Sequence, residues 1–196
     1  MVREELIALT GRDDCSLLFE NTAYNFKIYR LKVADHSHDI LFTEGMANYV
    51  QEVNEENNDL KHIELYFYLP EYWNLEVEDW PIYWLDRIAQ VPQKNNTWFG
   101  HGDTIPAGNP PISLQPNFEA NHFILSRPKA LDELINFSWK ASTKLLAVIP
   151  IFEKELNFKL RNSHSVLFKK FEKNNIDEKI DIYRTSCCRN RFLGLV

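Results

Sequence analysis

The sequence predicts an α+β fold, in which a mixed, largely antiparallel sheet is packed with helices. Two strand-like segments follow each other at residues 23–33 and 40–50, and residues 62–70 alternate with a period of two. Residues 80–89 repeat their apolar side chains at helical spacing instead. Because the strands gather early and do not alternate regularly with helices, a doubly wound parallel sheet is disfavoured.

The first sixty residues are expected to supply one short helix and two strands. Residues 3–11 can form a helix that Gly11 closes, and residues 23–33 are rich in the aromatic and branched side chains of strands. The next strand begins near residue 40 and is expected to break at Gly45 in a bulge or tight bend. Residues 53–59 are expected to form an exposed acidic loop.

Residues 62–70 carry the clearest strand pattern in the chain. One side of this strand holds aliphatic side chains and Phe67, and the other holds Glu64, Tyr66 and Tyr68. A period of two predicts a strand with one face on the core. Pro70 is expected to end it.

A helix is expected from about residue 80. Asp79 can cap it, and Pro81 suits its first turn. Its apolar face is formed by four residues at helical spacing: Ile82, Leu85, Ile88 and Ala89. Pro92 is expected to stop it, and residues 95–116 hold four prolines and three glycines. Such a long loop in a compact domain is often functional.

The second half is expected to add two strands and two or more helices. Residues 122–128 form a short strand, and residues 131–140 are either helical or a connection. The continuous apolar run at residues 144–152 suits a strand buried on both faces. A helix is expected to start near Glu153, and Ser163 can cap another. From residue 176 the chain is expected to form a late strand and an irregular tail.

Length, charge and cysteine content limit the possible functions. A chain of 196 residues suits one domain, and the net charge of −6 argues against a nucleic-acid binder. Residues 159–196 nevertheless hold nine Lys/Arg against four Asp/Glu, so the acidic excess lies in the rest of the chain. No apolar run could span a bilayer. The chain has three cysteines, Cys15, Cys187 and Cys188, and an odd number with one adjacent pair does not indicate a disulfide framework. Unpaired cysteines are typical of a reducing compartment, so we expect a cytoplasmic protein.

No arrangement of residues points clearly to catalysis. His36, His38, His101 and Asp103 could supply four ligands to a metal-dependent hydrolase, but no motif brings the two pairs together. The chain has no G-x-S-x-G motif and no P-loop. The pattern G-x-G-x-x-G also fails, because its third glycine position falls on Ile105. We therefore expect no catalytic residue, metal or other cofactor.

Aromatic residues are the remaining signal. Four of the five tryptophans fall between residues 73 and 98, with tyrosines close to them in the sequence. They could simply fill the core, because large rings dominate core packing. Tyr66 and Tyr68, however, point away from the aliphatic side of their strand, so some rings must cover a second surface. Tyrosine and tryptophan are also enriched at the centres of protein–protein interfaces.

Several segments occur in an order that resembles the suppressor-of-fused domain family. They are TEGMAN (43–48), ELYFYLPEYW (64–73), WPIYWLDRIAQVPQKNNTWFGHGDTIP (80–106) and VIPIFEKEL (148–156). The loop departs from the family's Gly-His-Thr form by two extra residues between His101 and Thr104. The resemblance implies one domain over residues 1–196, with the matching core at 24–175 and a C-terminal extension at 176–196.

The resemblance also implies a function. The animal suppressor of fused is a non-enzymatic protein that binds Gli transcription factors by clamping a peptide strand between two lobes, and this chain is similar to its N-terminal lobe alone. Short stand-alone bacterial members are expected to be immunity proteins that neutralise polymorphic toxins. The resemblance therefore implies a protein partner, such as a cognate toxin. The net charge and the lack of an apolar span lead us to expect no nucleic acid and no membrane as partners. Two alternatives stay open, a regulatory scaffold and the metal-dependent hydrolase.

The expected binding surface lies around the tryptophan-rich segment and the Gly-His-Gly-Asp-Thr loop. Occlusion of a partner's working site by aromatic and charged side chains is the expected mechanism. The oligomeric state is not predicted. The residues expected at the surface are Tyr72, Trp73, Trp80, Trp98, Phe99, His101, Asp103 and Thr104.

Overall fold

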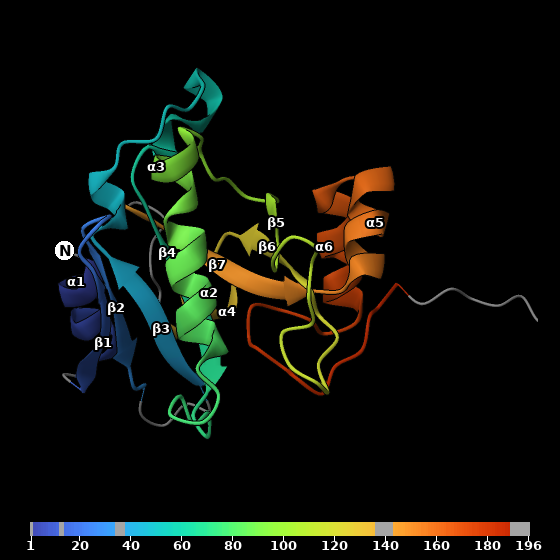
Figure 1. The fold of residues 1–196 in the computed structure, drawn as a ribbon, viewed down its shortest axis with the longest axis horizontal. Coiled ribbons are helices and arrows are strands. Elements are labelled where there is room, and N and C mark those ends of the chain that lie inside the picture. Colours follow the sequence, from blue (N-terminus) through green and yellow to red (C-terminus); the bar gives the residue numbers. More distant parts are fainter. Residues whose placement is uncertain (1, 12–13, 34–37, 136–142, 189–196) are drawn as a thin grey trace, which may run out of the picture.

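A computed structural model describes residues 2–11, 14–33, 38–135 and 143–188. In this part of the chain one sheet of seven strands has the order β1-β2-β3-β4-β7-β6-β5 (Figure 1). Only β4 and β7 pair in parallel, so the sheet is mixed and largely antiparallel, as predicted. Its strands are β1 (Cys15–Asn21), β2 (Phe26–Leu31), β3 (His38–Glu44), β4 (Ile63–Pro70), β5 (Thr104–Pro106), β6 (His122–Ser126) and β7 (Lys144–Ile151).

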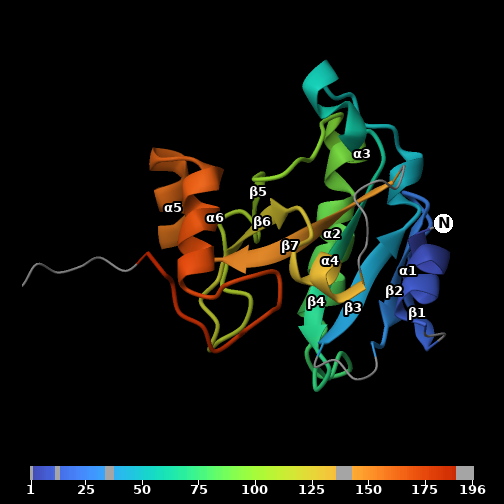
Figure 2. The ribbon, with the colours of Figure 1, turned by 180° about the vertical axis from the view of Figure 1, so that it is seen from behind.

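Helices cover both faces of this sheet. The described helices are α1 (Val2–Thr10), α2 (Trp80–Ala89), α3 (Val91–Asn95), α4 (Ala130–Ile135), α5 (Glu153–Arg161) and α6 (His164–Lys173). One core cluster joins the sheet to α2, and the second joins its other face to α1, α4 and α6 (Figures 1 and 2). In the described part of the chain, no helix is long and apolar enough to cross a membrane.

Strand β4 lies at the centre of the sheet and is buried along its whole length. Its aliphatic side chains and Phe67 join the α2 cluster, while Tyr66 and Tyr68 join the other cluster. The alternation therefore assigned the sides correctly. The expectation that only one face meets the core was wrong, because α1, α4 and α6 cover the second face as well.

Glu64 is a buried carboxylate that organises the turn after β3. It accepts hydrogen bonds from Thr43 Oγ1 at 2.6 Å and from the backbone N–H groups of Gly45 and Ala47 at 2.8 and 3.1 Å. Burial raises the pKa of Glu64, and these donors oppose that rise. Gly45 has a φ of 108°, and a Cβ there would lie 2.7 Å from the carbonyl oxygen of Asn25. The predicted break at Gly45 is confirmed, as a bend that ends β3.

Of the residues predicted to begin or end helices, Ser163 has the predicted role, Asp79 has it in part and Pro92 does not. Ser163 caps α6, since its side chain accepts a hydrogen bond from the N–H of Val166 at 3.3 Å. Asp79 precedes α2 as predicted, but its side chain makes no capping bond. Pro92 does not stop the helical chain, because it sits in the first turn of the short helix α3, where its missing N–H costs nothing.

Other local predictions also changed in the structure. The predicted acidic loop contains a 3-10 helix at Glu55–Leu60, and the long loop after residue 95 contains the short strand β5. The strand expected after residue 176 is reduced to one bridge between Tyr68 and Lys179. Strand β1 had no predicted counterpart, because its side chains show no alternation of buried and exposed positions. The burial of β7 on both faces is confirmed.

Candidate protein-binding surface

The Gly-His-Gly-Asp-Thr loop is fastened to the body of the protein by its own backbone. Asp103 Oδ2 accepts a hydrogen bond from the N–H of Gly100 at 2.7 Å. The N–H of Gly102 donates to the Leu125 carbonyl at 2.8 Å, and the Leu125 N–H donates to the Asp103 carbonyl at the same distance. Asp103 is thus a turn-forming residue, a role for which its short side chain is well suited.

His101 is half-buried and packs against α6 and the chain after β6. Its ring stacks on Phe168 with centroids 4.6 Å apart, and its Nδ1 accepts a hydrogen bond from the N–H of Arg127 at 3.1 Å. Burial, together with the nearby His164 and Arg127, lowers the pKa of His101 to about 4. The ring is therefore neutral at pH 7 and anchors the loop against α6.

The flanking residues of this loop are also tied to the chain. Phe99 is buried, and its N–H donates to Gln51 Oε1 at 2.9 Å. Trp98 is half-buried against the α2 cluster. Thr104 is half-buried and accepts a hydrogen bond from Lys159 Nζ at 3.3 Å. Phe99 was expected in the neighbourhood of the binding surface, and the structure places its ring in the core, where it anchors the loop.

Trp73 and Trp80 are core residues as well. Their exposed fractions are 3% and 8%, and their rings meet edge to face with centroids 5.5 Å apart. Trp73 Nε1 donates to the carbonyl of Glu78 at 2.9 Å, which fastens the loop between β4 and α2. These two rings were expected at the surface, and the structure places them beneath it.

Tyr72 is the one predicted binding residue that is largely exposed among the described positions, with 67% of its surface accessible. Tyr183 of the tail is 80% exposed and lies near Tyr72, as do Asp181 and Glu78. The pKa of Tyr72 is raised, mainly by burial and then by these three neighbours. We call Tyr72, Tyr183, Glu78 and Asp181 the tyrosine patch.

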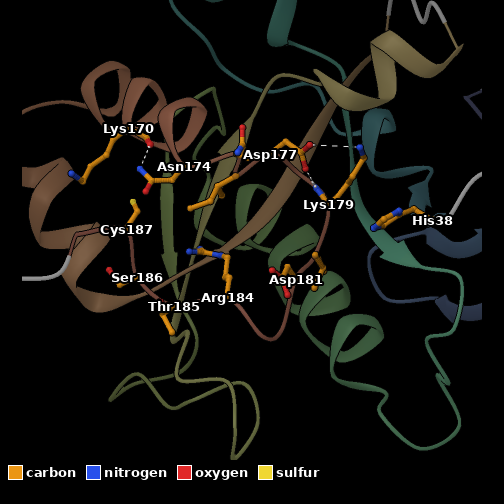
Figure 3. A pocket seen from close by; sticks show the side chains of 13 residues that line it. His38, Lys170, Asn174, Asp177, Lys179, Asp181, Arg184, Thr185, Ser186 and Cys187 are labelled. Atoms are coloured by element: carbon orange, nitrogen blue, oxygen red, sulfur yellow. Dashed lines mark hydrogen bonds and ion pairs between the residues drawn. The ribbon is translucent and has the colours of Figure 1, made fainter.

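An open groove of about 930 Å³ is lined in part by Asp181 of this patch (Figure 3). It runs between the end of α6, the tail from residue 174 to 187, and the start of β3 at His38. Lys179 and Asp177 form an ion pair at 3.7 Å on its wall. Asp181 lines the groove and also belongs to the tyrosine patch, so the two features are continuous.

A buried ion pair fixes the tail at the wall of the groove. Glu155, fully buried at the start of α5, accepts hydrogen bonds from Arg184 Nη1 and Nη2 at 2.9 and 3.0 Å, and one from the N–H of Cys187 at 3.0 Å. Arg184 also donates to the Pro150 carbonyl at 2.6 Å and lies over the ring of Phe152. Tyr183 is therefore carried by a rigidly held segment.

The tail is also fastened near α4. Glu178 is buried and accepts hydrogen bonds from the N–H groups of Lys129 and Leu131 at 2.8 and 2.9 Å. The hydroxyl of Tyr66 donates to the same carboxylate at 3.3 Å. A carboxylate at a helix N-terminus is favourable because free N–H groups converge there. The sequence did not predict these tail contacts, because isolated charged residues between 176 and 184 are usually solvated.

The three proposed metal ligands that lie in the described residues do not form a site. His38 contacts the ring of Tyr68, whereas His101 lies on Phe168, and His36 falls outside the described residues. Burial lowers the pKa of His38. Across the described residues, no group of three or more His, Cys, Asp or Glu side chains could hold a metal ion. The described part of the chain thus offers no ligand set for the hydrolase alternative.

Most of the chain matches one known protein family. A model of the suppressor of fused protein family (SUFU) matches residues 23–185. The chain belongs to the suppressor-of-fused family. The match extends to Thr185, directly after the arginine that pairs with Glu155.

Solved structures of the family share this fold. A putative SUFU homolog from Neisseria gonorrhoeae FA 1090 has a TM-score of 0.68 and 16% identity, over 95% of this chain and 94% of that one. The Sufu–Fu complex structure gives 0.61 and 14%, over 95% and 90%. Drosophila Suppressor of Fused gives 0.56 and 15%, over 83% of this chain and 42% of that one. No curated protein sequence matches this chain.

Proposed function

We propose that this member of the suppressor-of-fused family is a non-enzymatic protein-binding domain, and that it acts as an immunity protein that neutralises a toxin by covering the toxin's working site. The tyrosine patch carries the proposal. Tyr72 and Tyr183 expose most of their surfaces on segments that buried contacts hold in place. A tyrosine held in this way offers a large contact area at a small cost in conformational entropy.

The charge around the patch favours a basic partner. Residues 71–79 contain Glu71, Glu76, Glu78 and Asp79 and no lysine or arginine. A complementary positive surface would be steered toward this segment before contact, which raises the association rate. The tyrosine rings can then contact aliphatic stems and cationic heads, and their burial slows dissociation. The adjacent groove provides room for a protruding segment of the partner.

The comparisons support a binding role without naming the partner. The Sufu–Fu complex structure contains a family member bound to another protein, and it shares this fold. Its identity to this chain is 14%, so it supports the architecture and gives no contact residues. The proposed location is the cytoplasm, where the free thiols of Cys15, Cys187 and Cys188 would stay reduced.

Co-expression with the product of the adjacent open reading frame tests the proposal. We expect a stable complex and rescue of growth, if that product is toxic alone. The double variant Tyr72→Ala/Tyr183→Ala should weaken the complex at least about 100-fold, which is the loss typical of two central aromatic contacts. Leu160→Ala is the matched control, because Leu160 is 67% exposed on α5 outside the patch.

The outcomes separate the alternatives. A complex without toxicity would support a regulatory scaffold in place of an immunity protein. An equal loss in the control variant would contradict the assignment of the patch. Failure to recover any protein partner from the native cell would contradict the binding role itself.

A further inference from the structure

Strand β1 forms one edge of the described sheet, and β2 is its only partner among the described strands. The side chains of residues 16–20 are all exposed, and three consecutive ones are apolar. Leu17, Leu18 and Phe19 are 48%, 37% and 38% exposed. An edge strand presents unpaired backbone groups to any other strand, and proteins usually protect it with charge, proline or a covering element.

The two edges of the sheet differ in this respect. The opposite edge, β5, is only three residues long and ends in Pro106. The centre of β1 has neither charge nor proline between Ser16 and Phe19. Helix α1 shares a core cluster with Tyr29 and Leu31 of β2 and with Cys15 at the start of β1. Helix α2 contacts the other end of β1, where Asn21 Nδ2 donates a hydrogen bond to Asp86 Oδ1 at 2.6 Å. Between these two ends the side chains are exposed, so among the described residues the centre of β1 is open for pairing.

A bulge fixes which residues of β1 share a face. The register with β2 shifts between Leu17 and Phe19, so Leu18 is the extra residue. Leu17 lies opposite Tyr29, and Glu20 lies opposite Lys27, two residues away on β2. Leu17 and Glu20 therefore lie on one face, although their numbers differ by three.

The same reasoning places Ser16 and Phe19 together on the other face. They lie opposite Arg30 and Ile28, which are again two residues apart on β2. Cys15, opposite Leu31, joins the face of Glu20. Because of the bulge, residues at equal distances before and after the centre of β1 lie on the same face, as Ser16 and Phe19 do and as Cys15 and Glu20 do.

We propose that β1 pairs with β1 of a second copy of this chain, in an antiparallel, two-fold symmetric dimer with one continuous sheet. Residues opposite each other in such a pair must lie on the same face. The register with Ser16 opposite Phe19 of the second copy and Cys15 opposite Glu20 meets this condition on both sides of the bulge. Leu17 and Leu18 then meet their counterparts at the symmetry axis and bury the exposed apolar strip.

Two observations favour a second copy as the occupant. If a regular strand without a bulge paired with β1, residues opposite each other would share a face on one side of Leu18 but not on the other. In a second copy of β1 the same bulge is present, so opposite residues share a face on both sides of Leu18. The charges at the ends of the strip are already paired within each copy, Glu20 with Lys27 at 3.4 Å and Asp14 with Lys32 at 3.6 Å. In the proposed register no charged side chain faces one of like sign.

Sedimentation velocity of the full chain at tens of micromolar tests the dimer. We expect the mass of two copies, and Leu18→Lys should raise the dissociation constant at least about ten-fold, since it places two charges at the axis. Leu160→Lys, which places the same charge on α5, should leave the dimer intact. A monomeric wild-type chain, or an equal effect of both variants, would overturn the proposal.

Cross-linking tests the register and does not depend on the folding of Leu18→Lys. In a background in which Cys15, Cys187 and Cys188 are all replaced by serine, Ser16→Cys and Phe19→Cys are prepared as separate proteins and then mixed under oxidising conditions. Residues opposite each other lie within disulfide reach, whereas identical positions are about 10 Å apart along the strand. Only the mixture should give a reducible dimer. Cross-linking in each single protein to the same extent, or in none, would overturn the proposed register.

Discussion

The loop around Tyr72 and the loop around His101 differ in what holds them. Both carry aromatic and charged residues that the sequence placed at a binding surface. In the His101 loop the ring stacks on Phe168, and the Asp103 carboxylate closes its own turn. In the other loop Trp73 is buried while its neighbour Tyr72 is 67% exposed. The first loop braces the fold, and the second presents a side chain to solvent on a braced support.

This difference shows that aromatic composition alone does not distinguish a buried ring that supports a surface from an exposed ring that can contact a partner. Trp73, Trp80 and Phe99 bury their rings, so they stabilise the fold and cannot contact a partner directly. Exposure alternates between adjacent residues because successive side chains point in different directions. Variants of adjacent residues therefore separate the two roles.

Replacing Trp73 and Tyr72 separately should give the largest contrast. Trp73→Ala should lower the free energy of unfolding by about 3–5 kcal/mol, because it leaves a cavity beside Trp80. Tyr72→Ala should change it by no more than about 0.5 kcal/mol. Urea denaturation measures both. A loss of several kcal/mol in Tyr72→Ala would show that its ring supports the fold and would remove the basis for the patch.

Arg184→Met tests how the tail supports Tyr183. It leaves the carboxylate of Glu155 buried without its main partner, which should cost about 3 kcal/mol. The double variant Glu155→Met/Arg184→Met removes the unpaired charge and should recover part of this loss. Thermal unfolding measures the cycle. Equal losses for Arg184→Met and for an exposed pair such as Lys129→Met, which breaks a contact with Glu172, would contradict the role of the buried pair.

Gly102→Ala tests the packing of the His101 loop. Gly102 has a φ of 92°, and a Cβ there would lie 2.5 Å from the ring of His164, so we expect a loss of about 1–3 kcal/mol. Gly11→Ala is the control, since its φ is 65° and nothing lies within 4 Å of its Cβ. It should lose only about 1 kcal/mol. Chemical denaturation compares the two, and equal losses would mean that the His164 contact relaxes freely.

The pH dependence of stability tests the neutral state of His101. Its pKa falls from 6.5 when unfolded to about 4 when folded. The unfolded chain therefore binds a proton first, and stability is complete above pH 6.5 and falls as pH drops toward 4. This difference in pKa corresponds to about 3 kcal/mol, and solvent screening at the half-buried ring reduces the expected loss to about 1–2 kcal/mol.

The variant His101→Gln provides the control for this titration. Its side-chain oxygen can still accept from the Arg127 N–H, but it does not titrate. Denaturation between pH 7 and pH 4 should therefore show a shallower fall in the variant than in the wild type. An identical slope in both proteins would show that other groups cause the pH dependence.

Much of the fold could be predicted because local patterns and the final packing agree. The alternation at residues 63–69 follows from the geometry of a strand, and the apolar run at residues 144–151 marks a strand between two layers. Ser163 caps α6 by a contact within three residues. Strand β1 was missed because exposed side chains on both faces give no period to detect.

The candidate site was harder to predict because it joins distant segments. Tyr72 was identified from its sequence neighbourhood, but Tyr183 lies more than a hundred residues later in a tail without a pattern. What brings them together is a set of contacts at long range, chiefly Glu155 with Arg184 and Glu178 with the start of α4. No periodicity records such contacts.

The sequence by itself determined the order of most strands and helices, the bend at Gly45 and the membership of the family. These features depend on backbone geometry and on side chains close together in the chain. Only the tertiary structure decided which aromatic rings are buried, where the tail lies and which sheet edge stays open. Burial is a property of what covers a side chain, and the covering residues come from elsewhere in the chain.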